Sequence, residues 1–181
     1  MKNVDQVLKL VPAARLNRVS VAYENFKPVI ENFVAQVFET LERTSGKKHI
    51  TSESDYIKPI AFGTTKPAIK LSCYMRYGTK RYGRFGHSYL CVSNITVPEV
   101  IQRKGFLTAL LYVLMQECEE RKVILAVENP LENFLQNFLH DIGFVCYHKD
   151  PLGLGTYYRL LDDGLISNEP FYNIEAYRNA E

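Results

Sequence analysis

The chain has 181 residues, of which 46% are hydrophobic and 23% are charged, and its formal net charge is +2. These values are typical of one soluble globular domain with a sizeable core, and the sequence contains no internal repeat or low-complexity segment. No apolar run reaches the roughly 18 residues of a membrane span. The N-terminal MKNVDQVLKL carries Asp5 and Gln6, unlike a signal peptide. We therefore expect a cytoplasmic protein without membrane contact.

Hydrophobic periodicity predicts helices and strands along the whole chain. Pro59 cannot donate to a strand ladder, so we expect its strand at a sheet edge. The almost entirely apolar stretch 123–128 has the composition of a buried central strand. The expected elements, in chain order, are a helix over 3–10, a strand or helical continuation over 18–23, a helix over 24–44, strands over 56–62, 68–77 and 88–97 with a glycine-rich loop over 78–86, a helix over 104–121, a strand over 123–128, a helix over 130–143, and strands over 144–149 and 155–161.

This order of elements indicates a mixed α/β fold. We expect one central sheet of about six or seven strands, with helices on both faces and an N-terminal helical segment. The chain is predicted to be a single domain over 1–181. Its parts are a helical region at 1–50, a core at 51–161 and a C-terminal extension at 162–181.

The four cysteines are widely spaced and form no CxxC pair. No Cys/His ligand cluster is evident, although Cys146 and His148 form one C-x-H. We therefore predict no metal site and interpret the cysteines as buried thiols in a reducing compartment.

Charge is distributed unevenly along the chain. Residues 56–98 contain seven basic and no acidic residues, whereas 162–181 contain five acidic residues and one basic residue. Such asymmetry marks either a surface for an anionic partner or two faces of one domain that attract each other. Within the basic stretch, residues 74–89 interleave Arg and Lys with Tyr and Phe, as surfaces for single-stranded nucleic acid do. A solvated hairpin, or a surface for an acidic protein, fits the same pattern.

The stretch ITVPEVIQRKGFLTALL, residues 95–111, joins a strand to an apolar helix through a short basic loop. The first N–H groups of a helix lack partners, and the helix dipole adds partial positive charge there. Glycine lets the backbone approach a ligand closely, so such loops bind phosphate readily. Backbone N–H groups of 102–107, the cations Arg103 and Lys104 and the Thr108 side chain are all available to an anion. The alternative is a helix start that is merely basic.

The same stretch resembles the signature loop of the GCN5-related N-acetyltransferases, the GNAT family, whose pattern is Gln/Arg-x-x-Gly-x-Gly/Ala. Gln102 and Gly105 match its first two fixed positions, and Ile95 and Val97 match the end of the strand before it. The resemblance implies the GNAT fold, with acetyl-CoA as acyl donor and its pyrophosphate held by the loop. The cofactor-binding residues that it implies are Ile95, Val97, Gln102, Arg103, Lys104, Gly105, Phe106, Leu107, Thr108 and Asn129.

A second stretch, VENPLENFLQNFLHDIGFVCY, resembles the family's later strand, Asn, helix and Gly-Phe pair. Asn129 stands where the family often contacts the pantetheine arm, and Gly143 with Phe144 stands at the Gly-Phe pair. The element order agrees with the family fold over 56–161.

Two positions and one strand depart from the family pattern. Leu107 replaces the second Gly or Ala of the loop, and Leu139 stands where a tyrosine often serves as general acid. The strand over 88–97 has no carboxylate to serve as base.

Other residues are therefore the candidates for proton transfer. Transfer of an acyl group to an amine needs a neutral amine, a polarised carbonyl and often a proton donor. Glu128 and His87 are the candidate bases, and His140 or Tyr147 the candidate donors. Each also fits an ordinary structural role, and an amine that is already neutral needs no base.

Two functions remain open at this point. The first is an acetyltransferase that acts on an amine of a protein or small molecule. The second is a GNAT-fold binding or structural protein without catalysis, which contacts nucleic acid or a protein through 74–89.

Overall fold

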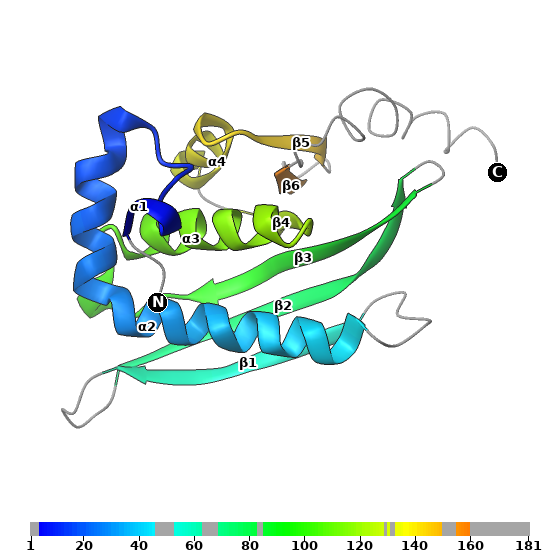
Figure 1. Ribbon diagram of the computed structural model, residues 1–181, viewed down its shortest axis with the longest axis horizontal. Helices are drawn as coiled ribbons and strands as arrows, with labels where there is room; N and C mark the ends of the chain where they lie inside the picture. Colours follow the sequence, from blue (N-terminus) through cyan, green and yellow to red (C-terminus); the bar gives the residue numbers. More distant parts are fainter. Residues whose placement is uncertain are drawn as a thin grey trace.

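The structure is a computed structural model that describes residues 4–45, 53–62, 69–82, 85–128, 130, 133–149 and 155–159. Helices and strands form one mixed α/β unit, which confirms the predicted class (Figure 1). The elements are α1 (Val4–Val7), α2 (Ala13–Ser45), β1 (Glu53–Phe62), β2 (Ile69–Tyr82), β3 (Phe85–Thr96), the 3-10 turn η1 (Glu99–Ile101), α3 (Phe106–Glu120), β4 (Ile124–Glu128), α4 (Asn133–Asp141), β5 (Phe144–Lys149) and β6 (Gly155–Arg159).

The six strands that the structure describes lie in the order β1-β2-β3-β4-β6-β5. Neighbours pair antiparallel except β3 and β4, which are parallel. β1 is an edge strand, as Pro59 predicts, and its register with β2 shifts between Ile57 and Ile60, around that proline. β4 lies inside the sheet and is buried from Ile124 to Val127, which confirms the second strand prediction.

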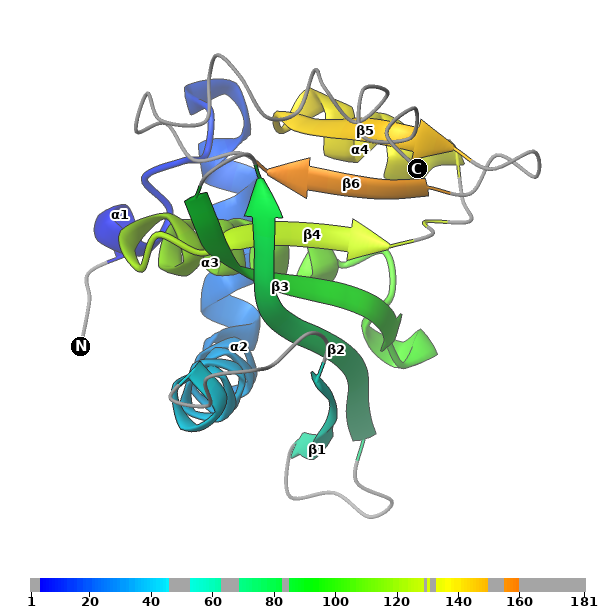
Figure 2. The same ribbon diagram turned by 90° about the vertical axis from the view of Figure 1, so that its right-hand side faces the viewer.

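The described helices all pack on one face of the sheet, so the prediction of helices on both faces is wrong for them. Val92 of β3 and Val127 of β4 belong to the same core as side chains from α1 to α4. Figure 2 views the sheet from its other face: α3 and α4 lie behind the strands, and the cyan arm of α2 is seen end-on beside β2 and β3. α3 joins β3 to β4 and α4 joins β4 to β5, and both crossovers proceed in the same direction across the sheet. Because such crossovers are right-handed, both helices fall on the same face.

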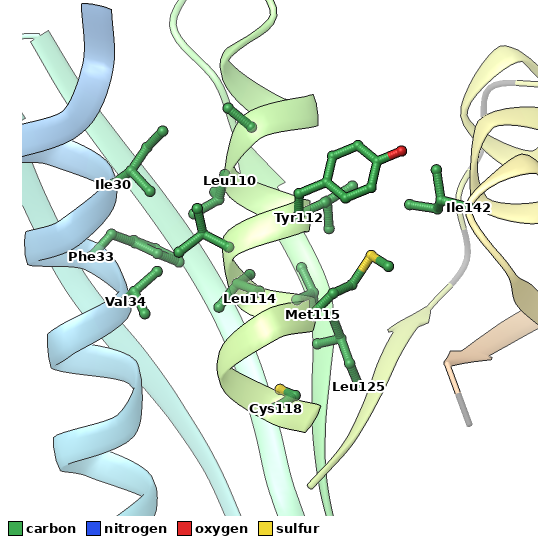
Figure 3. Close-up of a cluster of buried hydrophobic side chains, with 14 of the residues drawn as sticks. Ile30, Phe33, Val34, Leu110, Tyr112, Leu114, Met115, Cys118, Leu125 and Ile142 are labelled. Atoms are coloured by element: carbon green, nitrogen blue, oxygen red, sulfur yellow. The ribbon is translucent and has the colours of Figure 1, made fainter. Parts of the chain in front are cut away.

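α3 is the central helix of this core. Phe33 of α2 faces Leu110 of α3 on one side, and Tyr112 points the other way toward Ile142 (Figure 3). Ten of its fifteen residues are buried, as the apolar sequence predicts. In the part of the chain that the structure describes, no helix combines the length and apolarity required for crossing a bilayer.

α2 is one continuous helix, so residues 18–23 are helical rather than a strand. Pro28 lies inside it, and the helix axis changes direction about halfway along (Figure 1). Proline removes one intrahelical hydrogen bond and clashes with the preceding turn, which accounts for such a bend. The bend gives α2 two arms, and its N-terminal arm (Ala13–Lys27) contacts the start of α3 and α4.

The glycine-rich loop predicted over 78–86 is mostly strand. β2 and β3 remain paired from Ser72–Thr96 up to Tyr82–Phe85, and only 83–84 separate them. Backbone pairing tolerates the glycines because every residue but proline can supply the ladder bonds. The loop residues 83–84 and the extension at 162–181 lie outside the described residues.

Candidate active site

The two parallel strands diverge near their C-terminal ends. β3 pairs with β4 from Tyr89–Ile124 to Val92–Val127, but β3 continues to Thr96. Apolar side chains fill the space below this divergence and leave a free volume of only about 20 Å³. Ile95, Leu107, Val127 and Leu135 are among the residues that line this apolar crevice.

The loop after β3 is held in place by Gln102. Its side-chain Nε2 donates to the carbonyl oxygen of Val97 at 2.8 Å. Its backbone N–H donates to the carbonyl oxygens of Glu99, at 3.1 Å, and Pro98, at 3.2 Å. Gln102 therefore uses these donors inside the loop, where they brace the strand end against the helix start.

The loop ends in two residues of left-handed backbone conformation, Arg103 at φ 58° and Gly105 at φ 80°. Positive φ is uncommon outside glycine, so Arg103 marks an unusual turn. Gly105 is the N-cap of α3, and its carbonyl accepts from the N–H of Ala109 at 3.0 Å. Within the described residues, the backbone N–H groups of Gly105, Leu107 and Thr108 donate to no backbone carbonyl outside α3. Left-handed residues before a helix N-terminus make a concave set of N–H donors suited to an anion.

α2 lies directly against this loop. A Cβ built on Gly105 would stand 2.9 Å from the Cβ of Ala22, closer than real Cβ contacts allow. Ala22 is itself buried. Glycine is therefore required here for its backbone conformation and for the close approach of α2, whether or not a ligand binds.

A pocket of about 290 Å³ opens beside the loop, between α2, α3 and α4. Its polar side chains are Arg15, Arg18 and Thr108, and Phe138 forms one wall. No carboxylate is among the described residues that line it. We refer to this space as the arginine pocket.

The two arginines of this pocket differ in their partners. Arg15 donates from Nη2 to Oδ2 of Asp141 at 3.0 Å, and its guanidinium lies 5.9 Å from the ring centroid of Phe138. The hydrogen bond to Asp141 raises the pKa of Arg15. Arg18 forms no ion pair among the described residues.

The candidate catalytic residues lie at different places. Glu128 is half-buried at the end of β4, one residue beyond the last β3–β4 pair. His140 is exposed on α4, with its ring centroid 5.2 Å from that of Tyr157. His87 precedes Val92 by five residues, so its backbone lies about 17 Å back along β3, away from the divergence. Among the candidates whose side chains the structure describes, only Glu128 lies next to the diverging strands.

Several expected site residues cannot be placed at this site. Asn129 lies outside the described residues, and so do the side chains of His87 and Tyr147. Phe106 is buried in the core, and Leu107 faces the apolar crevice rather than the arginine pocket. Lys104 is exposed on the loop.

Sequence reasoning missed the contribution of α2. Arg15, Arg18, Val19 and Ala22 follow the i, i+3, i+4, i+7 spacing of one helix face, and all four line the arginine pocket. That spacing is the available signal, but local periodicity predicts no element over 11–17 and either a strand or a helix over 18–23. Tyr157, which packs against His140, is a buried structural residue whose hydroxyl donates to Gln136 Oε1 at 3.1 Å.

The cysteine predictions concern three described residues. Cys91 and Cys118 are buried and form no disulfide, and Cys146 is partly exposed. Burial raises the pKa of the Cys118 thiol. Across the residues described, no three His, Cys, Asp or Glu side chains gather as a metal site would require.

No protein-family model matches the sequence, and no curated protein matches it significantly. Solved structures that are similar include a "putative acetyltransferase" from Agrobacterium tumefaciens, at 13% identity and TM-score 0.37, covering 67% of this chain and 81% of the other. Ard1 from Thermoplasma volcanium has 17% identity and TM-score 0.33, with coverage of 50% and 70%. A variant of the toxin AtaT, bound to the C-terminus of the antitoxin AtaR and to acetyl-CoA, has 10% identity and TM-score 0.34, with coverage of 51% and 59%. These neighbours belong to the GNAT acetyltransferases, but superpositions with such low scores fix neither a site nor an activity for this chain.

Proposed function

We propose that this protein is an acyl-CoA-dependent N-acyltransferase of the GNAT type, which transfers acetyl from acetyl-CoA to an amine of a protein or small molecule. One observation carries the proposal. A strand leaves its parallel neighbour and enters a loop with two left-handed residues, Arg103 and Gly105, which presents the N-terminus of α3 to the arginine pocket.

The phosphate end of acetyl-CoA fits the residues present. The N–H groups of Gly105 and Thr108 lie at the start of α3, and the Thr108 side chain lines the adjoining pocket. Lys104 is exposed on the loop, and the pocket wall adds Arg18, which has no ion-pair partner among the described residues. Backbone donors, a helix N-terminus and uncompensated positive charge together favour a diphosphate.

The acyl end requires a change of side-chain position. The apolar crevice below the diverging strands has free space for about one or two water molecules. Leu107 and Leu135 line it, and they must move aside for an acyl arm to enter. Binding at the phosphate end therefore precedes opening of the crevice in this proposal.

The chemistry needs little from side chains. When bound, acetyl-CoA supplies a thioester: the amine forms a C–N bond to the acyl carbon, the C–S bond breaks, and the thiolate takes up the proton that the amine loses. Beyond Val92, β3 has backbone N–H groups without a β4 partner, and one of them polarises the thioester carbonyl. Glu128, half-buried beside the divergence, is the best-placed group to accept that proton from the amine and pass it on to the thiolate.

The alternative function, a binding protein that uses 74–89, has no supporting observation. Of these side chains the structure describes only Met75 and Tyr89, and both are buried. Contact of this segment with nucleic acid or with an acidic protein stays a prediction from the sequence, as does a cytoplasmic location.

The first test is the unfolding midpoint of the whole protein with acetyl-CoA at about 100 times its dissociation constant. Binding at that excess adds about 2.7 kcal/mol, which corresponds to about 5–11 °C for a chain of this size. Lys104→Glu should weaken binding about ten-fold through charge repulsion, equivalent to about 1.4 kcal/mol.

Lys9→Glu is the matched control. Lys9 lies beside Gln116, about 16 Å along α3 from Gly105, so the same change of charge there should leave affinity unaltered. Absence of any shift with acetyl-CoA or CoA would contradict the proposed function. Equal losses in the two variants would move the binding site away from the loop.

A further inference from the structure

The arginine pocket contains positive charge that the α3 loop alone does not explain. The loop lies on the core of the fold, whereas Arg15 and Arg18 come from α2, the N-terminal helix outside the region 56–161 that resembles the family. The buried contact of Ala22 with Gly105 fixes the N-terminal arm of α2 against the loop. These arginines are thus held beside the start of α3.

Arg15 serves to hold the helices together. Its ion pair with Asp141 joins α2 to α4, and Asp141 offsets its charge. Its guanidinium also lies over the ring of Phe138, which adds a cation–π contact. The carboxylate of Asp141 and the ring of Phe138 fix this guanidinium between α2 and α4, so we assign Arg15 a positioning role.

Arg18 carries the uncompensated charge of the pocket. It lies three residues after Arg15, about one turn along the same helix face, and is exposed. None of the described carboxylates forms an ion pair with it. A guanidinium presents a fork of N–H donors that matches a phosphate monoester, which carries up to two negative charges.

We infer that Arg18 binds the terminal phosphate monoester of the nucleotide half of CoA and thereby makes the protein selective for CoA over dephospho-CoA. The inference rests on the proposed function, and it divides the ligand between two parts of the site. Backbone donors of the α3 loop hold the diphosphate, and Arg18 of α2, positioned by the Arg15–Asp141 pair, holds the monoester.

The test is titration calorimetry of the full chain with three probes: CoA, dephospho-CoA and adenosine 3′,5′-bisphosphate. The wild-type protein should bind CoA more tightly than dephospho-CoA. Arg18→Ala should weaken binding of CoA and of the bisphosphate by about 10- to 100-fold, as loss of a charged hydrogen bond does. Its affinity for dephospho-CoA should stay within about two-fold of the wild-type value, because that ligand lacks the monoester.

Two further variants separate this role from general effects. Arg18→Lys keeps the charge but loses the fork, so it should retain part of the selectivity. Lys9→Ala removes one charge at the far end of α3 and should change neither affinity. Because Arg18 is exposed, the variants should unfold at the wild-type midpoint, which the same preparations will show.

The outcomes distinguish this inference from the function on which it rests. If the wild-type protein binds CoA but Arg18→Ala weakens CoA and dephospho-CoA equally, or weakens neither, the inference is overturned and the acyl-CoA site stands. If the wild-type protein binds none of the three probes, both fail.

Discussion

Replacement of Gly105 by alanine separates the structural role of this glycine from any ligand. The left-handed backbone at φ 80° costs an alanine about 1–2 kcal/mol. The new Cβ would stand 2.9 Å from Ala22 Cβ in a closely packed contact, and such overpacking costs about 1–3 kcal/mol. Together, Gly105→Ala should destabilise the protein by about 2–5 kcal/mol, or about 4–20 °C in the unfolding midpoint.

Gly143→Ala is the matched control for the backbone term. Gly143 has φ 89°, but its built Cβ meets only the end of the flexible Arg159 side chain, at 3.2 Å. This variant should therefore lose only about 1–2 kcal/mol. Ala22→Gly in the Gly105→Ala background should recover the overpacking part, so that the two changes are less than additive.

Urea unfolding followed by circular dichroism measures all four proteins without ligand. Equal losses in Gly105→Ala and Gly143→Ala, together with strict additivity of Ala22→Gly, would refute the contact between α2 and the loop. A free energy of unfolding close to that of wild type in Gly105→Ala would refute the left-handed conformation as well.

Three other predictions concern charge and burial. Burial raises the pKa of the Cys118 thiol, so Cys118 should be alkylated at pH 8.5 only as fast as the protein unfolds, whereas partly exposed Cys146 should react first. Mass spectrometry of the labelled peptides measures both alkylation rates, and equal rates would contradict the prediction. Burial, followed by a hydrogen bond to the carboxylate of Glu31, raises the pKa of Tyr23. Above pH 10 the unfolded chain therefore loses a proton that the native state keeps, and this group should lower the free energy of unfolding by up to about 1.4 kcal/mol per pH unit. Urea unfolding of Tyr23→Phe should show a shallower fall with pH, and an unchanged slope would count against this role of Tyr23. Replacement of Arg15 and Asp141 by alanine, singly and together, should give a coupling energy of about 0.2–1 kcal/mol in unfolding free energy. Because both side chains are partly exposed, this coupling should shrink with added salt, and a coupling that salt does not change would argue against a surface ion pair.

The loop and the strands could be predicted because their signals are local. Pro59 identifies an edge strand from its missing N–H alone, and the apolar run of 123–128 identifies a buried strand. The Gln102-to-Gly105 spacing located a basic helix start, and the structure adds that Gln102 braces this turn through Val97. By contrast, the glycines of 78–86 suggested a loop where strand pairing continues, because cross-strand partners are distant in sequence.

By itself, the sequence determined the element types, the mixed α/β class and the position of the loop before α3, since each depends on neighbours within a few residues. The face that the helices cover depended on the order of the strands, because two right-handed crossovers in one direction leave α3 and α4 on the same side. Only the tertiary structure placed Ala22 against Gly105 and Arg18 beside the start of α3, because both contacts join residues more than eighty positions apart. The physical reason is that long-range contacts follow from how helices share a core, which no local periodicity encodes.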